Sequence, residues 1–212
     1  MTVPTSGLIT VNDRGARSAT TFGSVEAGGG NMVFIKKLTA SSSGTLSFVD
    51  GASSVVLDST YKEYLFTFKN IHPATDSTYF QVNFRDGGTD YDATKTTTFF
   101  RAYHDEGDTS TALEYRTADD LAQGTGVQRL AGGVGNGNDE NTAGYLHLFN
   151  PSSTTFVKHF IARTIQNEGS SDMAVDTYIA GYCNVTAAID GVQFSMASGN
   201  IDAGDICLYG IL

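Results

Sequence analysis

The sequence predicts an all-β protein: an antiparallel two-sheet sandwich, jelly-roll-like, with an extended N-terminal arm. Three observations predict it. Apolar and polar side chains alternate along most of the chain, glycine accounts for 24 of 212 residues, and turn-forming residues separate the alternating runs. Alternation with a period of two places successive side chains on opposite faces of a strand. No strand alternates with a long helical segment, which disfavours a parallel βαβ architecture.

Residues 1–31 are predicted to form the arm. They are mostly small and polar, and they end in the glycine triplet at 28–30. Glycine has no side chain to pack and restricts φ least, so this triplet is expected to act as a hinge. The predicted organisation is an anchoring arm over residues 1–31 and a β-sandwich domain over residues 32–212. The residues expected to anchor the arm are Leu8, Ile9, Val11, Asn12 and Asp13.

The clearest strand covers residues 80–85, which read Phe-Gln-Val-Asn-Phe-Arg. One face would therefore carry three buried apolar side chains and the other three solvated polar ones. Similar alternation marks residues 64–69 and 192–197. Enrichment in β-branched and aromatic residues predicts further strands at 32–39, 44–49, 98–104, 144–149, 155–165, 173–183 and 205–212. Together with the three alternating runs, these segments give about ten strands. Residues 110–122 come closest to a helical period and are expected to form one short helix or helical turn.

The charge balance limits the possible partners. Lys and Arg number 13 and Asp and Glu number 23, so the formal net charge is −10. An acidic chain is poorly suited to neutralise phosphates, so no nucleic-acid partner is expected. Neither a membrane span nor a secretory signal is expected, since the sequence lacks an 18-residue apolar run and a basic segment leading into one. Cys183 and Cys207 lie in predicted strands and are expected to be buried free thiols rather than a bridge.

The densest titratable cluster follows an aromatic strand. It consists of His104, Asp105, Glu106 and Asp108. Two carboxylates could cleave a glycosidic bond at a separation of about 5 or 9 Å, but spacing in sequence does not give that separation. An ordinary polar loop is the preferred interpretation. The neighbouring aromatic side chains could stack on sugar rings, although a sandwich core is their more common role.

Other motifs give no support for catalysis or for a bound metal. Asp86, Asp90 and Asp92 offer oxygen ligands for calcium, but the glycine and bidentate glutamate of the helical-loop calcium pattern are missing. The glycine-rich residues 132–137 lack the Lys-Ser/Thr of a phosphate-binding loop and are expected to form a mobile loop. His147 and His159 lie on neighbouring predicted strands, the one arrangement that could bring two imidazoles together. No nucleophile elbow occurs, so we expect no enzymatic activity, no cofactor and no metal.

Three stretches carry a resemblance: residues 70–109, 144–164 and 198–212. Their most specific parts are the NIHPA turn at 70–74, the LFNP turn at 148–151 and the LYG strand at 208–210. Together they resemble a group of virion proteins encoded by phages of marine and other aquatic bacteria, cyanophages among them. Residues 4–13, PTSGLITVND, are similar to short segments of phage tail-fibre and tail-associated proteins. The resemblance covers about residues 32–212.

The resemblance implies a structural protein on the outer surface of a bacteriophage virion, made in the host cytoplasm. A tail appendage or tail-associated protein, anchored through its arm, is the leading hypothesis. We expect other virion proteins as partners and a homo-oligomer, with a trimer favoured. The alternatives are a capsid decoration protein and a receptor module that binds host surface glycan through loops 86–92 and 104–108. The resemblance implies no catalytic residue.

Overall fold

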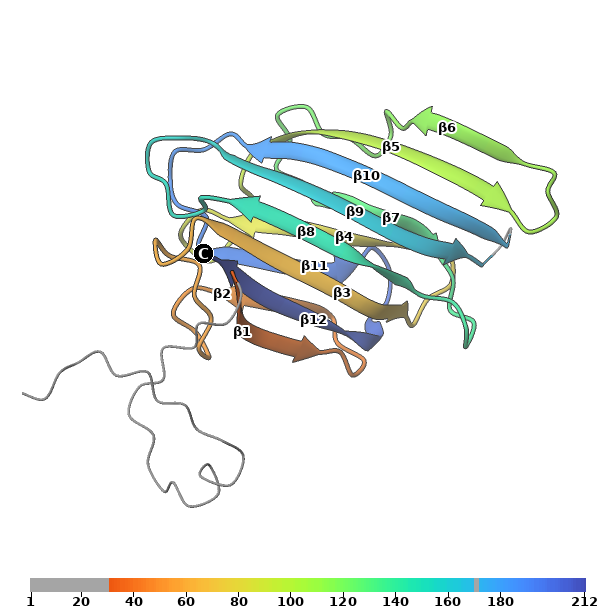
Figure 1. The fold of residues 1–212 in the computed structure, drawn as a ribbon, viewed down its shortest axis with the longest axis horizontal. Coiled ribbons are helices and arrows are strands. Elements are labelled where there is room, and N and C mark those ends of the chain that lie inside the picture. The colour runs from red at the N-terminus through yellow and green to blue at the C-terminus, as the bar shows by residue number, and fades with distance from the viewer. Residues whose placement is uncertain (1–30, 170–171) are drawn as a thin grey trace, which may run out of the picture. The chain divides into compact units, whose positions relative to one another are not determined.

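A computed structural model describes residues 31–169 and 172–212 of the chain. The predicted anchoring residues Leu8, Ile9, Val11, Asn12 and Asp13 lie outside these residues. Within the described part the fold is all-β, and every strand pairing is antiparallel, as the alternation of side chains predicts (Figure 1). No helix in this part is long and apolar enough to cross a membrane.

Twelve strands make up the described part. They are β1 (Met32–Thr39), β2 (Thr45–Val49), β3 (Glu63–Pro73), β4 (Thr78–Arg85), β5 (Lys95–Asp105), β6 (Thr111–Tyr115), β7 (Gln128–Val134), β8 (Thr142–Phe149), β9 (Lys158–Glu168), β10 (Met173–Cys183), β11 (Gly191–Met196) and β12 (Ile201–Ile211). The predicted bounds of β1 and β10 agree with the structure at both ends.

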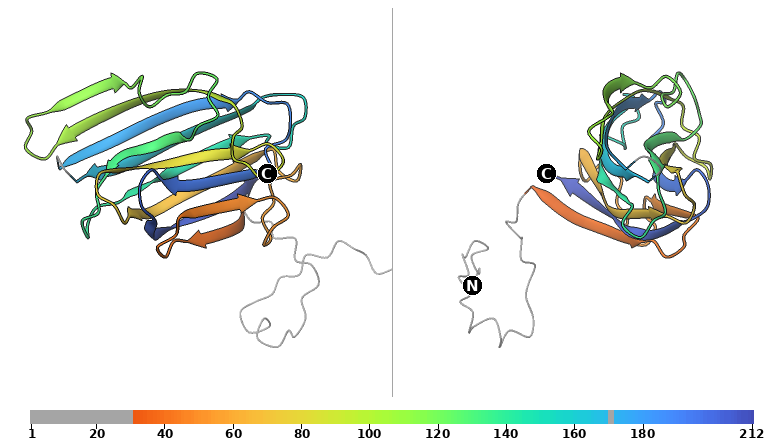
Figure 2. Two further views of the ribbon diagram at one scale, coloured as in Figure 1. Left: turned by 180° about the vertical axis from the view of Figure 1, so that it is seen from behind. Right: turned by 90° about the vertical axis from the view of Figure 1, so that its right-hand side faces the viewer.

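The strands form one hydrogen-bonded sheet that folds into two layers. The long layer has the order β1-β12-β3-β8-β9-β10-β5-β6, and the short layer has the order β7-β4-β11-β2. One residue pair, Val134 with Glu168, joins β7 to β9 and so connects the two layers. The right-hand view in Figure 2 shows the layers curving toward each other, so that the sheet nearly closes on itself.

The hydrophobic core lies between the two layers. Five phenylalanines from four strands meet at its centre, with neighbouring ring centroids 5.2–6.3 Å apart, and they are Phe48, Phe66, Phe68, Phe80 and Phe194. Most of these pairs are edge-to-face, which is a favourable arrangement of aromatic rings. The buried faces predicted for residues 64–69, 80–85 and 192–197 are confirmed.

Two sequence predictions of local structure are wrong. Residues 110–122 form no helix: β6 occupies 111–115, and a turn follows it. Its residues pair with β5, Phe100 opposite Tyr115 for example, so long-range pairing overrides a weak helical period. The glycines at 132 and 133 belong to β7 rather than to a mobile loop. Because glycine is uncommon in strands, the two glycines made this segment resemble a loop rather than a strand.

Buried lysines form hydrogen bonds to loops at one end of the sandwich. Lys95 is fully buried, and its Nζ donates to Asn83 Oδ1 at 2.6 Å and to the Ala93 carbonyl at 2.7 Å. Asn83, which was predicted to be solvated, is therefore buried. Lys158 Nζ donates to the Val185 carbonyl at 2.9 Å. Both lysines pair in register with Cys183, which is a buried free thiol.

Cys207 is also a free thiol, as predicted, but it is only half-buried. It lies on β12, where the neighbouring residues Ile206 and Leu208 point into the core. Strand alternation therefore turns Cys207 toward the outer face of the long layer.

Candidate functional site

The predicted cluster at residues 104–108 forms the tip of the β5–β6 hairpin. Asp105 Oδ1 accepts hydrogen bonds from the backbone N–H groups of Thr109 and Ser110, both at 2.8 Å. The Thr109 hydroxyl also donates to Asp105, and this bond is the main reason that the pKa of Asp105 lies below its usual value. Asp105 therefore stabilises the turn, since its carboxylate is already occupied by local donors.

The other members of this cluster are solvent-exposed. His104 Nε2 lies 3.0 Å from Asp108 Oδ1, and both side chains are mostly in water. Glu106 is exposed, and its backbone N–H donates to the Asp172 carbonyl at 3.0 Å. These carboxylates therefore lie on a solvated hairpin tip. They do not line an enclosed site that could surround a substrate bond.

Asp86, Asp90 and Asp92 lie on the loop between β4 and β5. Asp86 is half-buried, whereas Asp90 and Asp92 are exposed. Across residues 31–169 and 172–212, no three His, Cys, Asp or Glu side chains come close enough to hold a metal ion. This loop leads into β5 at residue 95, and the hairpin tip follows the end of β5 at residue 105. Ten steps along a strand cover about 33 Å, so the two predicted contact loops do not form one site.

The two histidines on neighbouring strands contact different partners. The β8–β9 register places His147 opposite Ile161. His147 Nε2 lies 3.0 Å from Glu63 Oε2, while the His159 ring packs against Tyr182 with centroids 5.9 Å apart.

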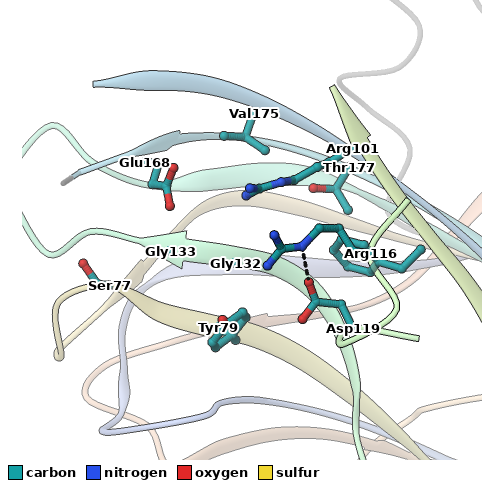
Figure 3. A pocket seen from close by; sticks show the side chains of 11 residues that line it. Ser77, Tyr79, Arg101, Arg116, Asp119, Gly132, Gly133, Glu168, Val175 and Thr177 are labelled. Atoms are coloured by element: carbon teal, nitrogen blue, oxygen red, sulfur yellow. Dashed lines mark hydrogen bonds and ion pairs between the residues drawn. The ribbon is translucent and has the colours of Figure 1, made fainter. Parts of the chain in front are cut away.

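A cavity that the sequence did not reveal lies between the two layers, beside β7. Its volume is about 210 Å³. The long layer contributes Arg101, Glu168, Val175 and Thr177, and β7 contributes Gly132 and Gly133. β4 contributes Tyr79, the turn before β4 contributes Ser77, and the segment after β6 contributes Arg116 and Asp119. Figure 3 shows Glu168 and Arg101 on one side of this cavity and Tyr79 across from them.

A chain of ion pairs holds the arginines of the cavity in place. Arg101 Nε donates to Glu114 Oε1 at 2.7 Å, and Arg116 Nε donates to Asp119 Oδ2 at 3.1 Å (Figure 3). The hydrogen bond to Asp119 is the main cause that raises the pKa of Arg116. Arg129 pairs with the same Asp119, whose side chain is only 4% exposed. Charge-assisted bonds of this kind fix the orientation of a guanidinium group.

Two glycines make room for the side chains that line the cavity. A Cβ at Gly132 would lie 2.8 Å from Cε1 of Tyr79, which is too close for any real contact. The Arg129 guanidinium stacks on the same ring, with its Cζ 3.9 Å from the ring centroid. At Gly133, where φ is +74°, a Cβ would collide with the Glu168 carboxylate. The glycine pair at 132 and 133 was thus the one signal of this site in the sequence.

The outer face of the long layer is the second notable feature. Eight of the eleven exposed large hydrophobic side chains in the described part point outward from its strands, and they are Met32, Phe34, Phe100, Leu113, Tyr115, Tyr145, Ile161 and Ile165. Phe100 and Tyr178 stack face to face across β5 and β10, with centroids 4.9 Å apart. Arg163 donates to both oxygens of Asp176 at 2.9 and 2.7 Å, so this charged pair neutralises itself.

Neither the outer face nor the cavity can be interpreted by analogy. No family model, curated protein or solved structure matches this chain. Its function must therefore be argued from these two features and from the sequence.

Proposed function

We propose that this chain is a structural subunit of a bacteriophage virion, an externally placed tail appendage or tail-associated protein that self-associates through the outer face of its long layer. The observation that carries this proposal is the gathering of exposed hydrophobic side chains on that face. Exposed apolar side chains that gather on one face of a soluble protein are a feature of interaction sites. The resemblance of residues 32–212 to phage virion proteins supports the assignment to a virion.

The area and charge of this face favour a second copy of the same chain as the occupant. Eight strands about 4.8 Å apart give this face a width of about 35 Å. The face is therefore wide enough for a stable interface, which needs about 800 Å² from each partner. Two chains with a formal charge of −10 repel each other at most surfaces. On this face, however, Arg163 is paired with Asp176, and Lys37 and Lys69 flank Asp205. The face therefore adds little charge repulsion to self-association.

The strand order supports a jelly-roll-like fold for this subunit. If the hairpin β5–β6 is counted as one element of the long layer and the pair β9–β10 is left aside, successive elements alternate between the layers. The long layer holds β1, β3, β5–β6, β8 and β12, and the short layer holds β2, β4, β7 and β11. Such alternation between two antiparallel layers is expected of interlocked Greek keys. Residues 1–31 are proposed as the arm that anchors the subunit to a neighbouring virion protein.

Light scattering on a sizing column tests the self-association. The full chain is expected to form a trimer, three times 22.5 kDa. The variant Ile161→Glu/Ile165→Glu adds two charges to the outer face and is expected to be monomeric. The matched control is Val127→Glu/Phe156→Glu, which adds the same charges at exposed positions outside the strands. Circular dichroism verifies that both variants fold. A monomeric wild-type chain, or an equally associated Ile161→Glu/Ile165→Glu variant, would contradict the proposed interface.

The location in the particle requires a separate experiment. An antibody raised against the purified chain should label intact particles of the phage that encodes it, at the tail. Label on the head would favour the alternative of a capsid decoration protein. Absence of the chain from gradient-purified particles, measured by mass spectrometry, would refute a virion role.

A further inference from the structure

The cavity beside β7 presents hydrogen-bond donors and acceptors next to each other. Arg101 and Arg116 use some of their N–H groups on Glu114 and Asp119 and retain others, because a guanidinium carries five donors. Glu168 supplies acceptors, and among the described residues its carboxylate forms no ion pair. The remaining lining includes the hydroxyls of Ser77 and Thr177.

The balance of charges limits which ligand can enter. An anion would be attracted by the arginines but repelled by Glu168 and by the nearly buried Asp119. A cation would meet the opposite conflict. A sugar hydroxyl both donates and accepts, so one ring can donate to a carboxylate and accept from a guanidinium without carrying a charge. The carbon face of such a ring can pack against Val175 or Tyr79, which also line the cavity.

The size of the cavity also favours a single sugar ring as the ligand. Pockets for drug-sized ligands occupy about 300–1,000 Å³. The volume of about 210 Å³ is smaller and suits one compact ring. Ion pairs with Glu114 and Asp119 hold Arg101 and Arg116 in place before a ligand arrives, which lowers the ordering cost of binding.

We propose that this cavity binds one neutral sugar residue of a glycan, with Glu168 accepting hydrogen bonds from its hydroxyls, Arg101 and Arg116 donating to them, and Val175 and Tyr79 contacting the ring. This site is distinct from the loops at 86–92 and 104–108. It does not depend on the proposed self-association, because the cavity lies on the inner side of the long layer and the exposed hydrophobic side chains lie on its outer side.

Saturation-transfer NMR on the full chain tests the proposal. The probes are the methyl glycosides of glucose, galactose, mannose and N-acetylglucosamine, with glycine and inorganic phosphate as charged comparators. At least one glycoside is expected to bind at millimolar concentration. The variant Glu168→Gln removes the charge but keeps the shape, and it should weaken binding about fivefold, because an amide oxygen accepts a weaker hydrogen bond than a carboxylate does. Thr177→Val, which replaces a hydroxyl by a methyl group, should weaken binding in the same direction.

The matched control is Glu106→Gln, which makes the same change on the exposed hairpin tip and should bind like the wild type. Melting temperatures verify that all variants remain folded. Absence of binding by all four glycosides would overturn the proposal. So would unchanged binding in Glu168→Gln, which would place the sugar elsewhere, or binding of glycine or phosphate in the absence of any sugar.

Discussion

The burial of Lys95 predicts that the stability of this protein rises with pH above neutrality. Its side chain is fully buried, and its Nζ is held by a side-chain amide and a backbone carbonyl rather than by a carboxylate. Burial therefore lowers the pKa of Lys95 from 10.5 to about 8. The native state then binds this proton less tightly than the unfolded chain does. Between pH 8 and 10.5 the unfolded state holds more protons, so the free energy of unfolding increases as pH rises.

The size of the effect follows from the two pKa values. A pKa of about 8 in place of 10.5 corresponds to about 3 kcal/mol between the two limits. Integrated from pH 7 to pH 9, the expected gain is about 1 kcal/mol. The upper limit of pH 9 is chosen because burial raises the pKa of Cys183 from 9.0 to about 12. Above pH 9 the unfolded thiol loses its proton first, and this opposes the Lys95 effect.

The assay compares the wild type with Lys95→Met, which retains the length of the side chain but does not titrate. Urea unfolding followed by circular dichroism suits a chain without tryptophan. Equal protein concentrations keep any contribution from subunit association comparable. Between pH 7 and pH 9 the free energy of unfolding should increase by about 1 kcal/mol more in the wild type than in Lys95→Met. Parallel pH profiles for the two proteins would refute the reasoning.

Three further predictions concern the cavity, the core and the arm. Gly132→Ala forces a methyl group into the neighbouring β4 tyrosine and should cost about 1–3 kcal/mol in chemical unfolding, whereas Gly126→Ala, in open space, should change stability by less than about 0.5 kcal/mol. Phe194→Ala removes the centre of the aromatic cluster and should cost about 3–5 kcal/mol, while Phe156→Ala on the surface should cost far less; equal losses would contradict the described core. Deleting residues 1–31 should leave a folded domain that is not incorporated into phage particles, and normal incorporation, measured on purified particles, would exclude an anchoring arm.

The sequence predicts strands well wherever one face of a strand is buried. In β4 the residues Phe80, Val82 and Phe84 are fully buried, as their alternation predicts. The prediction fails for β6 and β7, each for its own reason. β6 lies at the edge of the long layer and buries no complete face, so its residues show no clear alternation. β7 contains two glycines, which its neighbours require because their side chains occupy the space of a Cβ.

The candidate sites follow the same division. The candidate residues that the sequence suggests are clusters of neighbouring acidic residues, which the structure places at the two ends of β5. The cavity instead combines Tyr79, Arg101, Arg116 and Glu168, which are dispersed over about 90 positions of the chain. No local motif connects these residues, because contacts between strands and loops far apart in the chain bring them together.

The sequence by itself determined the all-β class, the approximate positions of ten strands and the core face of the clearest ones. These properties depend on a period of two, which reflects the geometry of a single strand and needs no partner. Only the tertiary structure decided which strand pairs with which, that Asn83 and Lys95 meet in the interior, and that one sheet face collects the exposed hydrophobic side chains. The reason is physical: these properties arise from contacts between strands far apart in the chain, and the alternation within one strand is compatible with many such pairings.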